Sequence, residues 1–281
     1  MQCISPISIP RPGGAGSSDR IEVPCGKCYA CLSRKRSEWA FRLQKEQKYS
    51  TSSYFFTLTY DDEHIPVNEN GFPSVSKDDV QRFMKRLRKM YAPNKIRYFI
   101  TSEYGPTTFR PHYHGILFNA PVASVDGLYR DLEKSWRLGF VEAGTVTPSS
   151  INYCAKYCIS KHSAPSGCEP CFNLMSRRPG LGSAFLEKNG SVFFEKLQDW
   201  TVFPGGYRVR LPRFFREKLF DPQRRRILAN RVQAFQEEQR KELEEYLASI
   251  GKSYPVYIHE VRQDYNRRME KQLTKKSKHF L

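Results

Sequence analysis

The alternation of apolar and polar residues after residue 50 predicts a strand followed by a helix. The segment SYFFTLTY, residues 53–60, alternates aromatic residues, Leu and Thr, which is typical of a strand. Residues 76–91 (SKDDVQRFMKRLRKMY) have the spacing of an amphipathic helix, with Ser76 as the predicted N-cap and Asp79 three residues later. The apolar stripe of this helix consists of Val80, Phe83, Met84 and Leu87.

Strands and helices continue to alternate up to residue 162. The period of the pattern predicts further strands at 95–105, 111–118 and 140–146. It predicts helices at 126–139, closed by Gly139, and at 149–162, with Ser149 or Ser150 near the N-cap. The resulting order, β–α–β–β–α–β–α, predicts an α+β fold of the ferredoxin-like type, with an antiparallel sheet and flanking helices.

The two ends of the chain differ from this central part. A cysteine cluster leads into a predicted helix in which Trp39 and Leu43 keep helical spacing. Residues 164–205 are rich in Gly, Pro and Ser, which predicts a long ordered loop. We therefore predict four regions: a Cys-rich N-terminal module leading into a helix (1–50), an α+β core (51–163), a basic loop region (164–212) and a helical basic C-terminal region (213–281).

The charge of the chain indicates a polyanionic partner. The 281 residues include 46 Lys and Arg against 29 Asp and Glu, a formal charge of +17. Nucleic acid is the simplest such partner, and the 16 Tyr and 19 Phe offer surfaces on which unpaired bases stack. The alternative is a basic protein without a polyanionic partner.

The sequence gives no sign of a membrane span or of a secretory signal. No apolar run approaches the roughly 18 residues of a span, and the segment MQCISPISIPRPGG lacks the charged and apolar regions of a signal peptide. We therefore expect a reducing compartment, in which clustered cysteines bind metal or stay free.

His112 and His114 are two residues apart in a predicted strand, so both side chains point to one side of it. If strands 95–105 and 111–118 pair in antiparallel fashion, Glu103 lies close to His112. Two imidazoles and a carboxylate suit Mn²⁺, Mg²⁺ or Zn²⁺ and leave positions open for a phosphate oxygen. The alternative is that Glu103 is a surface residue at the end of a strand.

Tyr153 and Tyr157 are four residues apart in the predicted helix and share one face, with Lys156 and Lys161 near its edges. A tyrosine can act as a nucleophile toward phosphorus, but its ordinary pKa of about 10 requires help from a cation or a polarised phosphate. The alternative is a pair of core aromatic residues. Cys154 and Cys158 are expected in the core rather than as metal ligands.

Taken in order, TLTY, PHYHGILF and YCAKYCISK resemble the three motifs of the HUH endonuclease superfamily. The two-tyrosine form resembles the rolling-circle replication initiators of the Microviridae, which are small single-stranded DNA phages. The segments PCGKCYAC, TLTYDDEHIP, SEYG with RPHYHG, and MSRRPGLG are similar to the gokushovirus branch, and the resemblance covers about residues 1–185. Cys154 and Cys158 depart from the pattern, because an aliphatic residue is more usual there.

The resemblance implies a metal-dependent single-strand DNA endonuclease and strand transferase. The substrate would be the phage replication origin, cut through a 5′-phosphotyrosine intermediate and later rejoined. Its implied site residues are the Mg²⁺ or Mn²⁺ ligands Glu103, His112 and His114 and the nucleophiles Tyr153 and Tyr157, while Lys156 would offset negative charge. The resemblance also implies action in the host bacterial cytoplasm with a host polymerase, and with a host helicase because the chain has no Walker A motif.

The cysteines predict a structural zinc site. Cys25, Cys28 and Cys31 have the spacing of zinc thiolates, and Cys3 would complete a tetrad. A rival tetrad combines Cys25 and Cys28 with the pair Cys168 and Cys171, and the resemblance favours the first set. The cysteines could instead hold an iron–sulfur cluster or remain free thiols.

Several basic runs are expected to follow DNA phosphates. These runs are SRKR, MSRRPG, RVRLPRFFREK and QRRRILANR. The residues that we single out for DNA binding are Arg177, Arg178 and Lys161.

Different functional classes fit the sequence less well. A HIT-type nucleotide hydrolase needs a third alternating histidine where this chain has Ile116. A two-histidine iron oxygenase usually has its acidic ligand within the first motif and its second histidine far away. A non-catalytic, zinc-stabilised nucleic-acid-binding protein explains the charge and the cysteines, but it gives no reason for the histidine and tyrosine pairs to occur together.

Overall fold

The structure, a computed structural model, describes most of the chain in two compact units. The described residues are 3, 5–11, 19–105, 107–157, 164–202, 206, 208–264 and 267. The first unit contains residues 1–190 and the second contains residues 191–281. Among the described residues, no helix is both long enough and apolar enough to cross a membrane.

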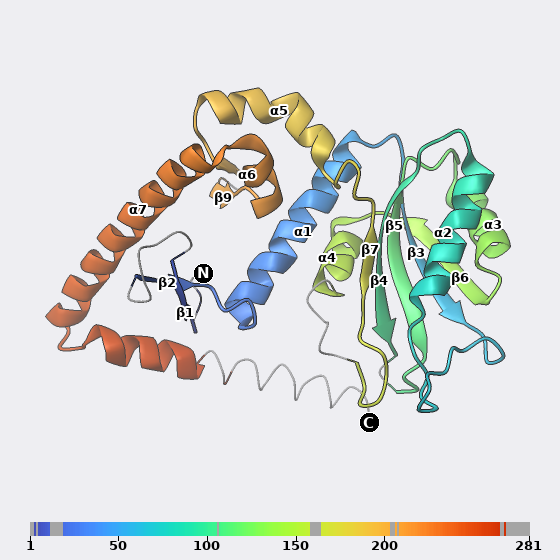
Figure 1. Ribbon diagram of the computed structural model, residues 1–281, viewed down its shortest axis with the longest axis horizontal. Helices are drawn as coiled ribbons and strands as arrows, with labels where there is room; N and C mark the ends of the chain where they lie inside the picture. The colour runs from blue at the N-terminus through green and yellow to red at the C-terminus, as the bar shows by residue number, and fades with distance from the viewer. Residues whose placement is uncertain are drawn as a thin grey trace. The chain divides into compact units, whose positions relative to one another are not determined.

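A five-stranded antiparallel sheet forms the centre of the first unit (Figure 1). Its strands are β3 (Ser53–Tyr60), β4 (Arg97–Tyr104), β5 (Pro111–Phe118), β6 (Gly139–Thr145) and β7 (Asn173–Met175). They are arranged in the order β6-β3-β5-β4-β7, and every neighbouring pair is antiparallel. The predicted α+β class and antiparallel sheet are confirmed, and so are the four strands predicted between residues 53 and 146.

Helices cover both faces of the sheet (Figure 1). One hydrophobic cluster joins one face to α2 (Lys77–Tyr91) and α3 (Val125–Trp136). A second cluster joins the other face to α1 (Tyr29–Tyr49) and α4 (Pro148–Tyr157). Each strand therefore sends alternate side chains into different clusters, as the period of two requires.

The alternation along β5 places the histidine pair. Tyr113 and Leu117 belong to the cluster under α2 and α3, whereas Ile116 and Phe118 belong to the cluster under α1 and α4. His112 and His114 have the same parity as Ile116, so they face the α1 and α4 side. The prediction that both imidazoles share one side of the strand is confirmed.

Helix α2 begins as the sequence predicts. The side chain of Ser76 accepts a hydrogen bond from the backbone N–H of Asp79, and all four residues of the predicted apolar stripe are buried. Because the first turn of a helix has no internal partners for its N–H groups, this cap fixes the start of the helix.

Two predicted helix ends are wrong by a few residues. Arg137, not Gly139, adopts the left-handed conformation after α3, with φ of 59°. Gly139 begins β6 at φ of +140°, where a Cβ would lie 2.3 Å from the backbone nitrogen of Asp61, so close strand approach requires glycine here. Before α4, Thr147 Oγ1 accepts from the backbone N–H of Ser150 at 3.1 Å, so Thr147 is the cap residue.

The loop predicted at 164–205 is wrong. This stretch contains β7, α5 (Ser183–Glu195) and β8 (Trp200–Val202). Phe185 and Phe193 are both buried and eight residues apart on α5, and this helical spacing outweighs the interior Gly190, which costs about 1 kcal/mol relative to alanine.

The remaining elements lie at the two ends of the chain. In the first unit, β1 (Ile7–Pro10) and β2 (Arg20–Val23) form an antiparallel pair. In the second unit, β8 pairs with β9 (Arg208–Arg210), followed by α6 (Arg213–Leu219), α7 (Pro222–Ser249) and a helical segment at 254–264. The helical character predicted from about residue 213 is confirmed.

Candidate metal and tyrosine site

The register of β4 and β5 brings the predicted ligands together. Glu103 lies directly opposite His112, and Thr101 lies opposite His114. Glu103 Oε2 is 3.1 Å from His114 Nε2 and 3.4 Å from His112 Nε2. One ligand atom from each of the three residues lies within 4.8 Å of the others, as a shared metal ion requires.

The donor set fits a divalent cation. Two imidazole nitrogens and one carboxylate oxygen are ligands that Mn²⁺, Mg²⁺ and Zn²⁺ accept, and three protein ligands leave coordination positions for a substrate oxygen. His114 is only 7% exposed and Glu103 is partly exposed. The carboxylate therefore lies at the open side of the cluster, where a phosphate can approach.

Hydrogen bonds to the other ring nitrogens orient both imidazoles. His112 Nδ1 is 3.1 Å from the backbone oxygen of Arg110, and His114 Nδ1 is 3.2 Å from Thr57 Oγ1. If each Nδ1 carries the proton, it donates to these oxygens and each Nε2 keeps a lone pair for a metal. Thr57 is a residue of the site that the sequence did not single out.

Glu103 is held in its charged form. Burial alone would raise the pKa of this carboxyl, but hydrogen bonds with His112, His114 and Tyr157 outweigh burial and lower its pKa well below the ordinary range. Glu103 is therefore a carboxylate at neutral pH, the form that binds a cation.

Tyr153 projects from α4 directly onto the three candidate ligands. Its hydroxyl donates to Glu103 Oε2 at 3.2 Å and lies 3.3 Å from His114 Nε2. Its side chain remains 37% exposed, so a substrate can reach it. Burial raises the pKa of Tyr153, so the phenol is protonated at neutral pH.

Tyr157 and Lys156 complete the helix face. The Tyr157 ring centroid is 4.9 Å from that of Tyr153 and 6.0 Å from that of His114. Burial raises the pKa of Tyr157 well above the ordinary value. Lys156 Nζ lies 5.3 Å from the Tyr157 ring centroid. Cys154 is buried on the opposite side of α4, as predicted, whereas Cys158 and Lys161 lie outside the described residues.

A strip of polar groups extends from the site across the sheet. Thr101 lies opposite His114 on β5 and opposite Asn173 on β7. The buried Oγ1 of Thr101 and Oδ1 of Asn173 have no hydrogen-bond partner among the described residues. Buried polar atoms without partners are uncommon, and here they lie beside the candidate ligands.

A second group of potential metal ligands lies near the N-terminus. The thiols of Cys3, Cys25, Cys28 and Cys31 lie within 4.8 Å of one another. The backbone N–H of Cys28 donates to Cys25 Sγ at 3.2 Å, and this bond and a second from the backbone of Lys27 lower the pKa of that thiol. Burial raises the pKa of Cys31 to about 12 in the absence of a cation.

The rival tetrad is wrong. Cys171 is buried in the cluster beneath α2 and α3, and Cys168 packs against that cluster. Neither residue belongs to the group of four thiols, which contains Cys3 instead. The first predicted set is therefore the one that the structure brings together.

Arg177 and Arg178 do not reach the histidines and tyrosines. They line a pocket beside Arg97 and Tyr98, at the beginning of β4, whereas Glu103 lies near the end of that strand. The sequence predicted these arginines as DNA ligands without indicating where they lie.

Comparisons with known proteins point to replication proteins. The model of the replication-associated protein ORF2 family matches residues 53–163. The replication-associated protein ORF2 of Spiroplasma virus 4 is 29% identical over 216 residues, which cover 70% of this chain and 67% of that protein. No solved structure matches the chain.

Two further relatives are also phage proteins. The replication-associated protein VP4 of Bdellovibrio phage phiMH2K is 29% identical over 219 residues, covering 69% of this chain and 66% of that protein. The replication-associated protein ORF4 of Chlamydia phage 1 is 26% identical over 219 residues, covering 70% of this chain and 53% of that protein. The matched part therefore spans between about half and two thirds of these relatives.

Proposed function

Residues 53–163 belong to the replication-associated protein ORF2 family, and from this premise we propose that the chain initiates rolling-circle replication of a single-stranded DNA phage. In this proposal it is an HUH endonuclease. It nicks the origin in single-stranded form, keeps the 5′ end as a phosphotyrosine and later rejoins the displaced strand.

The observation that supports this proposal most strongly is the position of the Tyr153 hydroxyl. It lies within 3.3 Å of two potential metal ligands, Glu103 and His114. A nucleophile and a cation site at hydrogen-bonding distance are what phosphoryl transfer requires. The strand order β6-β3-β5-β4 also agrees with the ferredoxin-like arrangement expected of an HUH core.

The protein's own residues would bind and orient the reacting groups. Glu103, His112 and His114 would hold Mg²⁺ or Mn²⁺, and the bound ion would supply Lewis-acid polarisation of the scissile phosphate. Thr57 and the backbone oxygen of Arg110 would fix the imidazole rings through their Nδ1 atoms. Helix α4 would carry the nucleophile to the open side of this cluster.

The chemical step is a transesterification. The Tyr153 oxygen forms a bond to phosphorus and loses its proton, while the bond from phosphorus to the 3′ oxygen breaks and that oxygen takes up a proton. The products are a 5′-phosphotyrosine and a free 3′-OH, which a host polymerase would extend. Since one phosphodiester bond replaces another, neither cutting nor rejoining needs ATP.

Tyr157 would act in the second transfer. Its ring is adjacent to that of Tyr153 and to that of His114. While Tyr153 is bound to the DNA, a free tyrosine can attack the regenerated junction and release the circle. Lys156, near the Tyr157 ring, would offset negative charge on the phosphorane or the phenolate.

Incubation with single-stranded origin DNA and Mn²⁺ or Mg²⁺ tests the function. We expect a covalent protein–DNA band on a denaturing gel that is lost with a chelator and in His114→Ala. Tight, salt-sensitive DNA binding without any covalent band would contradict the proposal and favour a non-catalytic, zinc-stabilised DNA-binding protein.

We also propose that the four N-terminal thiols hold a structural zinc ion. Cys3 precedes β1, Cys25 and Cys28 follow β2, and Cys31 lies in the first turn of α1, so one ion would join these elements. Four cysteines are a usual ligand set of closed, structural zinc sites. Action in the host bacterial cytoplasm, with a host helicase for strand separation, completes the proposed role.

A further inference from the structure

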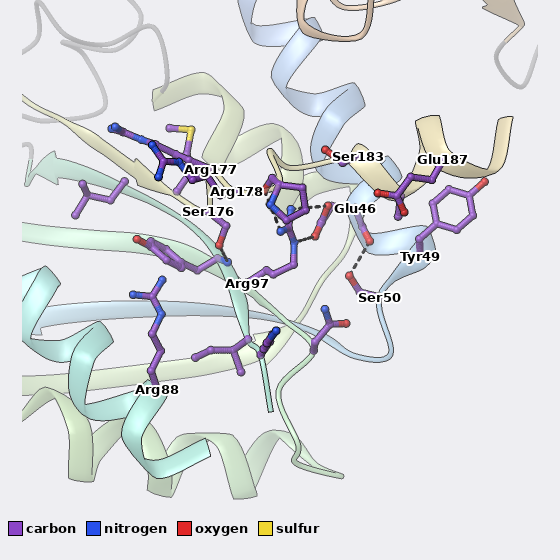
Figure 2. Close-up of a pocket in the computed structure, with 18 of the residues that line it drawn as sticks. Glu46, Tyr49, Ser50, Arg88, Arg97, Ser176, Arg177, Arg178, Ser183 and Glu187 are labelled. Carbon is purple, nitrogen blue, oxygen red and sulfur yellow. Dashed lines mark hydrogen bonds and ion pairs between the residues drawn. The ribbon is translucent and has the colours of Figure 1, made fainter. Parts of the chain in front are cut away.

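A basic pocket of about 880 Å³ lies at the edge of the sheet, at the beginning of β4 (Figure 2). We call it the edge pocket. Arg97, Tyr98, Ser176 and the two arginines that follow Ser176 lie on one side of it, and Arg88 of α2 lies on another. Its volume is within the range of about 300–1,000 Å³ that is usual for ligand sites.

The backbone that carries Arg177 and Arg178 is tightly fixed. On one side, the backbone N–H of Ser176 donates to the oxygen of Tyr98 at 3.0 Å, and Ser176 Oγ accepts from the N–H of Tyr98 at 3.1 Å. On the other side, Arg97 Nη1 donates to the backbone oxygen of Pro179 at 3.0 Å. Both arginines therefore project from an anchored segment.

A buried carboxylate strengthens this anchor. Glu46 of α1 is 5% exposed, forms an ion pair with Arg97, and accepts from the backbone N–H of Gly182 at 2.6 Å. This ion pair neutralises both charges inside the fold, so Arg97 and Glu46 position the segment rather than attract a ligand. Figure 2 shows this pair behind Arg177 and Arg178.

The exposed charge of the edge pocket is strongly positive. Five exposed basic side chains in its lining form no ion pair with another described residue, and the exposed acidic residue of the lining is Glu187. The five are Lys77, Arg88, Lys95, Arg177 and Arg178. A concave surface lined by one sign of charge attracts a polyanion.

The pocket also has an aromatic and cationic stack. The Arg88 guanidinium lies 5.0 Å from the ring centroid of Tyr98, and both residues line the pocket. Tyrosine rings and arginine planes are surfaces on which unpaired bases stack, and such bases are exposed only in single strands.

We propose that the edge pocket binds the backbone of single-stranded DNA at a distance from the nicking site. The choice of single-stranded DNA as ligand rests on the proposed function. Arg97 and Glu103 are six residues apart on β4, which corresponds to about 20 Å along a strand. At a spacing of about 3.4 Å per nucleotide this is about six nucleotides from the scissile phosphate.

The test is DNA binding by the nicking-deficient double variant Tyr153→Phe/Tyr157→Phe. The probe is a 20-nucleotide oligothymidylate, and its affinity is measured by fluorescence anisotropy across a range of salt concentrations. We expect Arg177→Gln/Arg178→Gln to reduce the slope of log K against log salt by about 1.4, because each phosphate contact to a single strand contributes about 0.7. Arg88→Gln, on the opposite wall, is expected to weaken binding as well.

The matched control is Arg130→Gln/Lys134→Gln, which removes the same charge from exposed positions of α3 outside the pocket. We expect its slope to equal that of the parent protein. Equal slopes for the pocket variant and the control, with unchanged thermal melting, would overturn the proposal. An equal loss of duplex binding, or tighter pocket-dependent binding of oligouridylate, would also overturn the assignment to single-stranded DNA.

The measurement separates this inference from the proposed nicking. A reduced slope in the pocket variant supports the edge pocket even if no covalent band forms with any origin. A covalent band together with an unchanged slope leaves the nickase intact and removes the edge pocket from DNA binding.

Discussion

At the scale of single residues, the site depends on groups that orient the ligands as much as on the ligands. Thr57 and Thr59 occupy the same face of β3 and lie in register with His114 and His112, respectively. Only the hydroxyl of Thr57 forms a hydrogen bond with its histidine among the described contacts, at 3.2 Å from Nδ1. These two threonines therefore provide a natural comparison.

We expect Thr57→Val to weaken Mn²⁺ binding about 10–100-fold, as the loss of such a supporting hydrogen bond typically does. Valine keeps the shape of threonine but leaves the imidazole without its acceptor. Titration calorimetry of Mn²⁺ measures the change directly and does not depend on activity. Thr59→Val is the control, and an equal loss in both variants would show that Thr57 has no special role.

The ligand triad was predictable from the sequence, whereas Thr57 was not. The period of a strand places His112 and His114 on one side, and one assumption about strand pairing brings Glu103 to them. Thr57 reaches the site only because β3 lies on the other side of β5, in a particular register. Alternating threonines are ordinary strand patterning and carry no signal of this contact.

At the scale of elements, a buried tyrosine pair ties α2 to the sheet. Tyr60 Oη donates to Asp79 Oδ2 at 3.0 Å and lies 2.9 Å from Tyr113 Oη. The N–H of Ser76, the helix cap, donates to Tyr113 Oη at 2.8 Å. The N-terminus of α2 is therefore joined to both β3 and β5.

This pair makes the fold sensitive to alkali. Burial, followed by the neighbouring Tyr113, raises the pKa of Tyr60 above its unfolded value of about 10. The unfolded chain then loses protons that the folded chain retains, so the free energy of unfolding is constant below about pH 10 and falls above it.

We expect Tyr60→Phe to cost about 1–3 kcal/mol at neutral pH, because a buried bond to a carboxylate is lost. We also expect it to flatten the alkaline loss of stability. Urea unfolding between pH 8 and 11 measures both effects, with Tyr246→Phe on the exposed surface of α7 as control. An unchanged alkaline slope would contradict this account of the pair.

The N-terminal elements depend on the proposed zinc ion. We expect the purified chain to contain one zinc per molecule by mass spectrometry and Cys3→Ser to lose most of it, with a lower melting temperature. Cys168→Ser is the control, because that residue packs against another cluster. Equal zinc content in both variants would rule out the four-thiol site.

Element positions were predictable where the period was strong, and less so at caps and in mixed segments. The strand at 111–118 and the cap of α2 follow directly from side-chain chemistry. The position of Gly139 is set by the close approach of β3, which the local sequence does not reveal. Helix α5 was missed because its glycine-rich and serine-rich flanks outweigh its apolar spacing.

At the scale of the whole molecule, the charge of +17 predicts a polyanion but gives no location for it. The fold of the first unit separates two functions along one strand. The candidate ligand Glu103 lies near the end of β4, and the edge pocket lies at its beginning. This separation depends on tertiary structure, so no motif in the sequence reports it.

The central claim is that Tyr153 attacks the scissile phosphate first. The measurement that tests it most directly is the mass-spectrometric identification of the DNA-linked peptide after one round of cutting. It compares the wild type with Tyr153→Phe, Tyr157→Phe and the double variant. We predict a phosphotyrosine at Tyr153 in the wild type, an undiminished first adduct in Tyr157→Phe and none in the double variant. A first adduct on another residue, or an adduct that survives in the double variant, would contradict the account.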